Sequence, residues 1–233
     1  MKRMRNCGVP HLDRDGDVWL LNIGNDENRL TTQWLADIHT LLDEVAATPP
    51  PVALVTMAEG KFFSNGLDLD WLTTHLDEAA GYIDSVHSLL VKLTILPMPT
   101  IAAIQGHCFA AGAMLAIAHD WRVMRADRGF FCLPEVDIGL PFSPGMDALL
   151  RAKLPVATAL EAMTTGNRYG GTAAAAAGLV TTAVAEDDVL PHAVERAREL
   201  AGKAGPTLGT IKARMFADVV ELLSQGSPDT VSS

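Results

Sequence analysis

Four short apolar runs alternate with helical segments in the first two-thirds of this chain. These runs have the length of strands and lie at residues 18–23 (VWLLNI), 52–57 (VALVTM), 100–104 (TIAAI) and 121–126 (WRVMRA). The second and third are apolar apart from one threonine each, which is typical of strands covered on both faces of a sheet. Residues 31–47 carry apolar side chains at helical spacing. The alternation predicts an α/β core.

Helices are predicted for most of the remaining chain. One helical stretch is expected to run to about residue 95, with a break near Gly81, because prolines at 97 and 99 end it. The small-residue run at 110–118 (AAGAMLAIA) indicates a helix, and Ser143 followed by Pro144 is a typical helix start. From residue 157 onward the pattern is helical, apart from a strand-like piece at 179–184.

Composition excludes several classes of function. With 18 basic and 28 acidic residues the formal charge is −10, so no basic stripe for nucleic acid is expected. The three cysteines show no C-x-x-C spacing and the seven histidines do not cluster, so neither a disulfide framework, a metal site nor a bound cofactor is indicated. No apolar stretch has the length of a membrane span, and no apolar run follows the basic start. We therefore expect a cytoplasmic protein that does not bind membranes.

Two segments place backbone N–H groups at the start of a helix. Residues 61–69 (KFFSNGLDL) lead from a strand through a glycine turn into a helix, with Asp68 positioned to cap it. Residues 105–114 (QGHCFAAGAM) also lead from a strand to a helix, through residues small enough for a ligand to approach the backbone. The first N–H groups of a helix have no partner within it, so they suit an anion or a polarised carbonyl oxygen.

A third segment offers a candidate base. Glu135 lies in LPEVDIGLP, where its neighbours are Leu, Pro, Val and Ile. Poor solvation raises the pKa of a carboxyl group toward neutrality, as the abstraction of a proton from carbon requires. A structural ion pair is the alternative reading of Glu135, and Asp137 is the reserve base. His107 is expected to be a packing residue.

Together the three segments resemble the crotonase superfamily, that is, the enoyl-CoA hydratase/isomerase family. KFFSNGLDL is similar to its pattern F-(S/A)-(A/N)-G-x-D-(L/I), and QGHCFAAG is similar to (N/Q)-G-x-(A/C)-x-G-(G/A)-G. Ala110 stands where the second pattern usually has glycine. PEVDIGL is similar to the P-E-x-x-x-G segment, and the resemblance extends from about residue 14 to residue 215.

The resemblance implies a spiral of strand–strand–helix turns followed by helices for oligomerisation. On that basis we expect a core with the CoA site and the active site at residues 1–185 and a helical region at 186–233. A homotrimer, or a hexamer of paired trimers, is implied by the resemblance alone. The implied ligand is an acyl-CoA, in which coenzyme A is part of the substrate.

The resemblance also implies roles for particular residues. The thioester oxygen would be held by the N–H groups of Leu67 and Ala111. The CoA moiety would be bound by the following residues: Ser64, Asn65, Gly66, Asp68, Lys61, Arg29 and Lys212. Pocket depth would depend on Leu72, Phe109, Phe142 and Met146.

One departure from the family's hydratases indicates the reaction. Those enzymes use two glutamates, and this chain keeps Glu135 but has Met114 at the other position. Hydration needs both, whereas moving a double bond from C3–C4 to C2–C3 needs one mobile carboxylate, as in the family's Δ3,Δ2-enoyl-CoA isomerases. We therefore predict isomerisation of 3-enoyl-CoA to 2-trans-enoyl-CoA. The alternatives are another crotonase reaction on an acyl-CoA (hydratase, thioesterase or dehalogenase type) and a non-catalytic acyl-CoA-binding protein.

Overall fold

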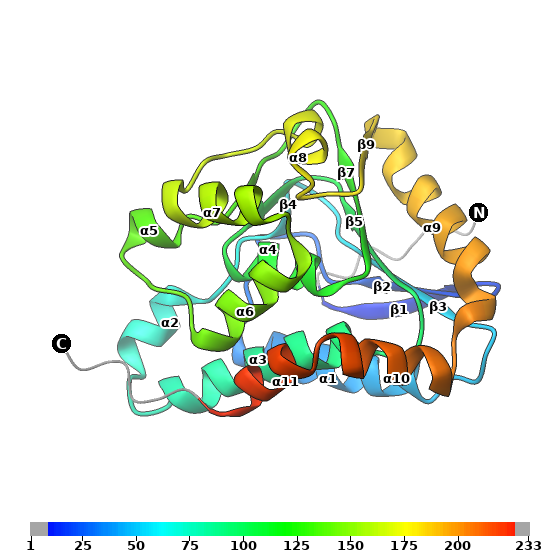
Figure 1. Ribbon diagram of the computed structural model, residues 1–233, viewed down its shortest axis with the longest axis horizontal. Coiled ribbons are helices and arrows are strands. Elements are labelled where there is room, and N and C mark those ends of the chain that lie inside the picture. The colour runs from blue at the N-terminus through cyan, green and yellow to red at the C-terminus, as the bar shows by residue number, and fades with distance from the viewer. Residues whose placement is uncertain (1–8, 227–233) are drawn as a thin grey trace.

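A six-stranded sheet forms the centre of the molecule in the computed structural model, which describes residues 9–226 (Figure 1). Residues 1–8 and 227–233, the outer ends of the two regions expected above, lie outside the described part. The sheet order is β1-β2-β3-β5-β7-β9. Its strands are β1 (His11–Asp15), β2 (Val18–Asn22), β3 (Ala53–Met57), β5 (Thr100–Ile104), β7 (Trp121–Arg125) and β9 (Thr182–Val184). Only the β1–β2 pair is antiparallel.

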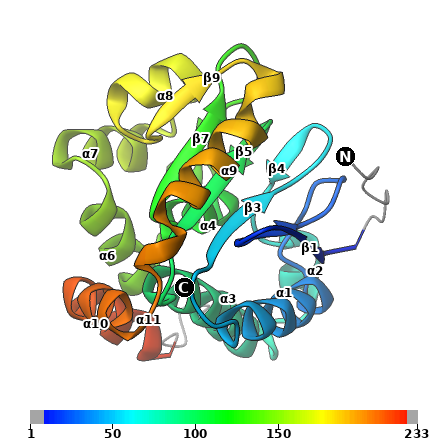
Figure 2. The ribbon, with the colours of Figure 1, turned by 90° about the vertical axis from the view of Figure 1, so that its right-hand side faces the viewer.

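Successive residues of the strands in the large sheet point to opposite faces, and each face packs against a different part of the protein. One face packs against helix α9 (Val189–Leu200), which lies across the sheet in Figure 2. The buried strand residues on this face are Val18, Leu20, Ala53, Val55, Met57, Ile101, Ala103 and Val123. The intervening residues, such as Leu21, Leu54 and Ile104, belong to the larger core on the other face. This is why the central runs consist almost entirely of apolar residues.

A second sheet of three short parallel strands produces a repeated strand–strand–helix pattern. Its strands are β4 (Phe62–Ser64), β6 (His107–Phe109) and β8 (Phe131–Cys132), in that order. Each follows a strand of the large sheet and leads to a helix: α2 (Leu69–Thr74) after β4, α4 (Ala111–Ala118) after β6, and α5 (Glu135–Ile138) after β8. The three segments singled out in the sequence therefore lie at equivalent points of successive turns.

The remaining helices complete the fold. They are α1 (Thr32–Ala46), α3 (Ala79–Ile95), α6 (Pro144–Lys153), α7 (Val156–Thr165), α8 (Gly171–Ala177), α10 (Pro206–Met215) and α11 (Ala217–Ser224), with short 3-10 turns at Glu186–Asp188 and Ala201–Lys203. In Figure 1, α1, α3, α10 and α11 form a layer below the sheets. Ser143 caps α6 by accepting the Met146 N–H, as its Ser-Pro start predicts. No helix within residues 9–226 is both long and apolar enough to cross a membrane.

At two places the secondary structure differs in detail from what the sequence indicated. The helical stretch before residue 95 is interrupted at residues 75–78, between α2 and α3, and Gly81 lies inside α3. Nothing within 4 Å meets a Cβ built on Gly81, so this glycine serves no close contact and no break. Strand β1 was not expected, because its sequence HLDRD is polar; it forms by main-chain pairing with β2.

Helix α10 is attached to the large sheet by a buried ion pair. The Lys212 Nζ lies 2.5 Å from the Asp120 carboxylate, and their side chains are 7% and 12% exposed. Lys212 also donates to the Met98 carbonyl oxygen, while Asp120 accepts the Thr100 N–H. Burial lowers the pKa of Lys212, and Asp120 opposes that effect. Removing either partner would leave a buried charge without compensation.

We expect Asp120→Asn to lower the free energy of unfolding by about 3 kcal/mol, because the buried Lys212 would lose its counter-ion. Urea denaturation of the variant and the wild type measures the difference. Asp15→Asn is the matched control, since the Asp15–Arg198 pair is more than half exposed on both sides and is expected to change stability far less. Equal changes in the free energy of unfolding for the two substitutions would contradict the idea that burial makes the Asp120–Lys212 pair important for stability.

Candidate active site

Two turns, one from each of the first two sequence motifs, pack directly against each other through glycine. A Cβ built on Gly66 would lie 3.0 Å from the Ala110 Cβ and 3.1 Å from the Ala111 nitrogen. A Cβ built on Gly112 would lie 2.6 Å from Ser64. Gly66 also has a φ of +83°, which favours glycine. The turn after β4 and the turn after β6 can therefore approach each other only because both positions lack a side chain.

The close approach brings two unpaired amides to one cavity. Leu67 follows Gly66, and Ala111 is the first residue of α4; both line the cavity. Within residues 9–226, neither N–H group donates to a protein acceptor. Ala111 lies at the positive end of the α4 dipole, which favours negative charge there. The pair can stabilise an oxygen atom on which negative charge develops.

Ala110 has a backbone conformation that side chains rarely adopt. Its φ is 51° and its ψ is −128°. For a residue with a Cβ, such a conformation costs of the order of 1–3 kcal/mol and persists only where the surroundings enforce it. The Ala110 N–H donates to the Cys132 carbonyl oxygen, and the Ala110 carbonyl accepts the N–H groups of Ala113 and Met114. These bonds attach Ala110 to β8 on one side and to α4 on the other.

The Glu135 carboxylate lies in the same cavity with one oxygen unpaired. Glu135 begins helix α5 and is 5% exposed, and its Oε2 has no hydrogen-bond partner within the described residues. Burial raises the pKa of Glu135 from 4.5 to about 7. The carboxyl group can therefore both accept and release a proton near neutral pH.

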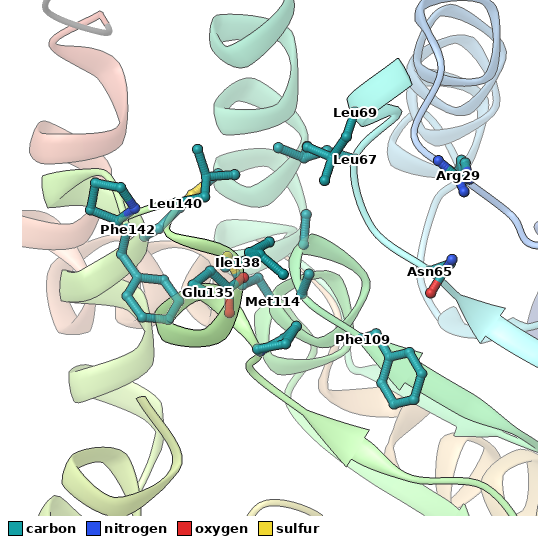
Figure 3. Close-up of a pocket in the computed structure, with 15 residues that line it drawn as sticks. Arg29, Asn65, Leu67, Leu69, Phe109, Met114, Glu135, Ile138, Leu140 and Phe142 are labelled. Atoms are coloured by element: carbon teal, nitrogen blue, oxygen red, sulfur yellow. The ribbon is translucent and has the colours of Figure 1, made fainter. Parts of the chain in front are cut away.

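The cavity is polar at one end and apolar at the other. Its volume is about 210 Å³. In Figure 3, Glu135 and Met114 lie near its centre, with Arg29 and Asn65 on one side and Leu140 and Phe142 on the other. Phe109 and Met146 also line it, as the sequence predicts, whereas Leu72 does not. An amphipathic ligand with a reactive centre in its middle suits this arrangement.

The structure brings together only part of the predicted CoA-binding set. Of residues 64–68, Asn65 and Leu67 line the cavity. Ser64 is fully buried, and its hydroxyl donates to the Asn28 carbonyl and accepts the Gly66 N–H. Asp68 caps α2 by accepting the Trp71 N–H. These two side chains therefore hold the turn in place, and Asn65 is the polar residue among 64–68 that lines the cavity.

The predicted cations differ in their surroundings. Arg29 lines the cavity, but it pairs with Glu27 at 2.6 Å and with Asp70 at 3.4 Å. Lys61 is exposed outside the cavity and lies over the Phe62 ring, 5.1 Å from its centroid. Lys212 is on α10 and is buried in the ion pair with Asp120. The structure thus gives Lys212 an internal partner in place of the CoA moiety that the resemblance implies.

Other polar groups near the motifs have structural contacts. The His107 ring packs among Phe62, Phe109 and Phe130, and burial is the main cause that lowers its pKa. Asp137 is exposed and does not line the cavity. Within residues 9–226, no group of three or more His, Cys, Asp or Glu side chains could hold a metal ion.

Tyr82 is a supporting residue that sequence reasoning missed. Its hydroxyl accepts the Asp68 N–H and donates to the Leu30 carbonyl oxygen, so it joins the first motif to the loop before α1. Burial raises the pKa of Tyr82 to about 12, which keeps the hydroxyl protonated. Tyr82 is 14 residues from Asp68 and lies in α3, so no local sequence pattern predicts the hydrogen bond between them.

Comparisons with known proteins agree with this geometry. A family model described as "Enoyl-CoA hydratase/isomerase" matches residues 18–228. "Enoyl-CoA delta isomerase 2, peroxisomal" of Arabidopsis thaliana is 35% identical over 91% of this chain and 94% of its own length. "Enoyl-CoA delta isomerase 3" of the same plant is 34% identical over the same shares. The solved structure of a probable enoyl-CoA hydratase from Mycobacterium tuberculosis superposes with a TM-score of 0.86, at 25% identity, and covers 93% of this chain and 92% of that one. The predicted α/β spiral with helices at its C-terminal side is thereby confirmed.

The raised pKa of Glu135 predicts a pH-dependent gain of stability in Glu135→Gln. A carboxyl group whose folded pKa exceeds its unfolded value stabilises the fold below pH 4.5, and this contribution disappears as the pH rises through about 7. The rise from 4.5 to about 7 corresponds to at most about 3 kcal/mol. We therefore expect the variant to be more stable than the wild type at pH 8 and to lose that advantage at pH 4.5. Thermal unfolding across this range measures the effect; an advantage that does not change with pH would contradict the burial of a charge at Glu135.

Proposed function

The chain belongs to the enoyl-CoA hydratase/isomerase family, and we propose that it converts 3-enoyl-CoA thioesters to 2-trans-enoyl-CoA. The observation that carries this proposal is that Glu135 is the single carboxylate among the described residues that line the cavity. Glu135 has an unpaired oxygen there, and Met114, an apolar side chain, lines the same space. The names of the two Arabidopsis relatives support the same reaction.

One carboxylate is enough for the isomerisation. The Glu135 carboxylate takes a proton from C2, and the electron pair of that C–H bond moves into a dienolate that extends from the thioester oxygen to C4. The protonated Glu135 then returns the proton to C4, and the double bond is left between C2 and C3. No atom is gained or lost, so no second acid, water molecule or redox group is required.

The two free amides have a defined part in this mechanism. Negative charge in the dienolate lies mainly on the thioester oxygen, where the Leu67 and Ala111 N–H groups would donate to it. Removing one such donor from an enzyme typically costs about 2.7–4 kcal/mol of transition-state stabilisation. Because the donors are already in place and have no protein acceptor to leave, little reorganisation is needed when the charge develops.

The direction of the substrate follows from the two ends of the cavity. The acyl chain beyond C4 would lie against Leu140 and Phe142, where apolar surface is buried. The pantetheine and nucleotide would leave past Asn65 and Arg29, toward the exposed Lys61. Arg29 already has acidic partners, so we assign the positive charge for CoA phosphates mainly to Lys61.

We expect Glu135→Gln to reduce the kcat for 3-enoyl-CoA isomerisation by about 10²–10⁴-fold, because the amide cannot accept the C2 proton. The assay follows formation of the conjugated thioester by its ultraviolet absorbance, and calorimetry checks that a saturated acyl-CoA still binds. Asp137→Asn is the control, since Asp137 lies two residues away but outside the cavity. Undiminished turnover in Glu135→Gln, or loss of turnover only in Asp137→Asn, would refute the assignment.

Hydration of 2-enoyl-CoA is the second candidate activity, favoured by the name of the family and by that of the similar structure from Mycobacterium tuberculosis. It needs one group to activate water and another to protonate C2, and the side chain at 114 cannot serve as either. We expect the wild type to hydrate 2-trans-enoyl-CoA at less than about 1% of its isomerisation rate, since an acid–base group typically contributes 10²–10⁴-fold. Loss of the conjugated absorbance measures it. A hydration rate comparable to isomerisation would replace the proposal, and binding without either turnover would indicate a non-catalytic acyl-CoA-binding protein.

A further inference from the structure

The strained backbone of Ala110 lies between the two turns that carry the free amides. Its φ of 51° and ψ of −128° belong to a region in which glycine is usual. Glycine at this position would relieve the strain, yet the chain has alanine. Backbone strain of this kind concentrates at sites where the surrounding structure uses it.

The methyl group of Ala110 is placed to separate the two turns. A Cβ built on Gly66 would lie 3.0 Å from the Ala110 Cβ, so the methyl group lies beside the first turn. Ala110 directly precedes the Ala111 donor, as Gly66 directly precedes the Leu67 donor. Both turns line the same cavity. With the Ala110 methyl group beside Gly66, the two turns, and with them the two donors, have little space to approach each other more closely.

The backbone of Ala110 has little freedom to relax. Its N–H is bonded to Cys132 of β8 at 3.1 Å, and its carbonyl is the first acceptor of α4, at 2.8 Å from the Ala113 nitrogen. Relief of the strain by rotation would break one of these bonds. The side chain also limits rotation, because an L-residue has fewer accessible conformations than glycine.

We propose that Ala110 is a positioning residue whose methyl group, held against Gly66, sets the distance between the Leu67 and Ala111 N–H donors. The inference rests on the proposed use of these two amides to hold the thioester oxygen. Alanine in place of the family's usual glycine makes this turn less stable and restricts its backbone. Ala110 would thus lower the stability of the protein and fix the positions of the two N–H donors.

The test compares Ala110→Gly with the wild type and with Ala113→Gly. Ala113→Gly removes the same methyl group from the buried interior of α4, three residues further on. The probe is 2,4-hexadienoyl-CoA, a conjugated thioester whose absorbance moves to longer wavelength when hydrogen bonds polarise its carbonyl group. The Tm of each protein, the red shift of the bound probe, and kcat and KM for 3-enoyl-CoA isomerisation are measured.

We expect Ala110→Gly to raise the Tm, because strain is relieved, and to bind the probe with a smaller red shift. Its kcat should fall about tenfold with KM little changed, since a displaced donor affects the transition state more than binding. Ala113→Gly should lower the Tm and keep the red shift of the wild type. An unchanged red shift in Ala110→Gly, or an equal loss in both variants, would overturn the inference. The red shift needs no turnover, so it decides this inference even if the wild type proves not to be an isomerase.

Discussion

The contact between the turn after β4 and the turn after β6 determines what the cavity can do. Each turn supplies one unpaired amide, and neither amide is useful unless the other lies within reach of the same ligand atom. Gly112 allows the approach because a Cβ there would overlap Ser64 at 2.6 Å, and Gly66 because a Cβ there would be crowded by Ala110 at 3.0 Å. Ser64 is buried beneath Gly112, and its hydroxyl bonds hold the first turn to the loop at Asn28. The donors are thus fixed by backbone packing, and no long flexible side chain has to be ordered when a ligand binds.

Helix α4 links this contact to the rest of the molecule. All eight of its residues are buried, so it has no solvated face, and its terminal carbonyl groups need partners within the protein. Arg122 donates to the Ile117 and His119 carbonyls, and Lys153 donates to those of Ala118 and His119. Two cations at the C-terminal end complement the helix dipole, while the N-terminal end keeps the Ala111 N–H free. Burial lowers the pKa of Lys153 from 10.5 to about 7, because its ammonium group at the end of α4 has lost most of its hydration.

Glu135 and Ala110 both reduce stability at the cavity. A carboxylate with an unpaired oxygen loses its hydration, and its raised pKa is the measure of that loss. Ala110 keeps a backbone conformation that glycine would adopt more easily. The surrounding structure tolerates both because it is extensively buried: the larger core extends from Leu21 to Leu223 and includes α1, α3, α4 and α6. Natural proteins concentrate such unfavourable features at functional sites.

Local patterns of the sequence determined much of this protein. The runs that became β3 and β5, the Ser-Pro start of α6 and the three motifs that supply Leu67, Ala111 and Glu135 all depend on neighbours in the chain, so they can be read without coordinates. Tertiary structure decided the rest. The polar strand β1 depends on main-chain pairing with β2. Ser64 holds Asn28, which is 36 residues away, and Lys212 is buried against Asp120, which is 92 residues away. The Ala110 methyl group lies beside Gly66 only because folding packs the turn after β6 against the turn after β4. A sequence pattern indicates which hydrogen bonds and ion pairs a residue is able to form. Which partner it forms them with depends on the tertiary structure, because folding brings distant segments of the chain together.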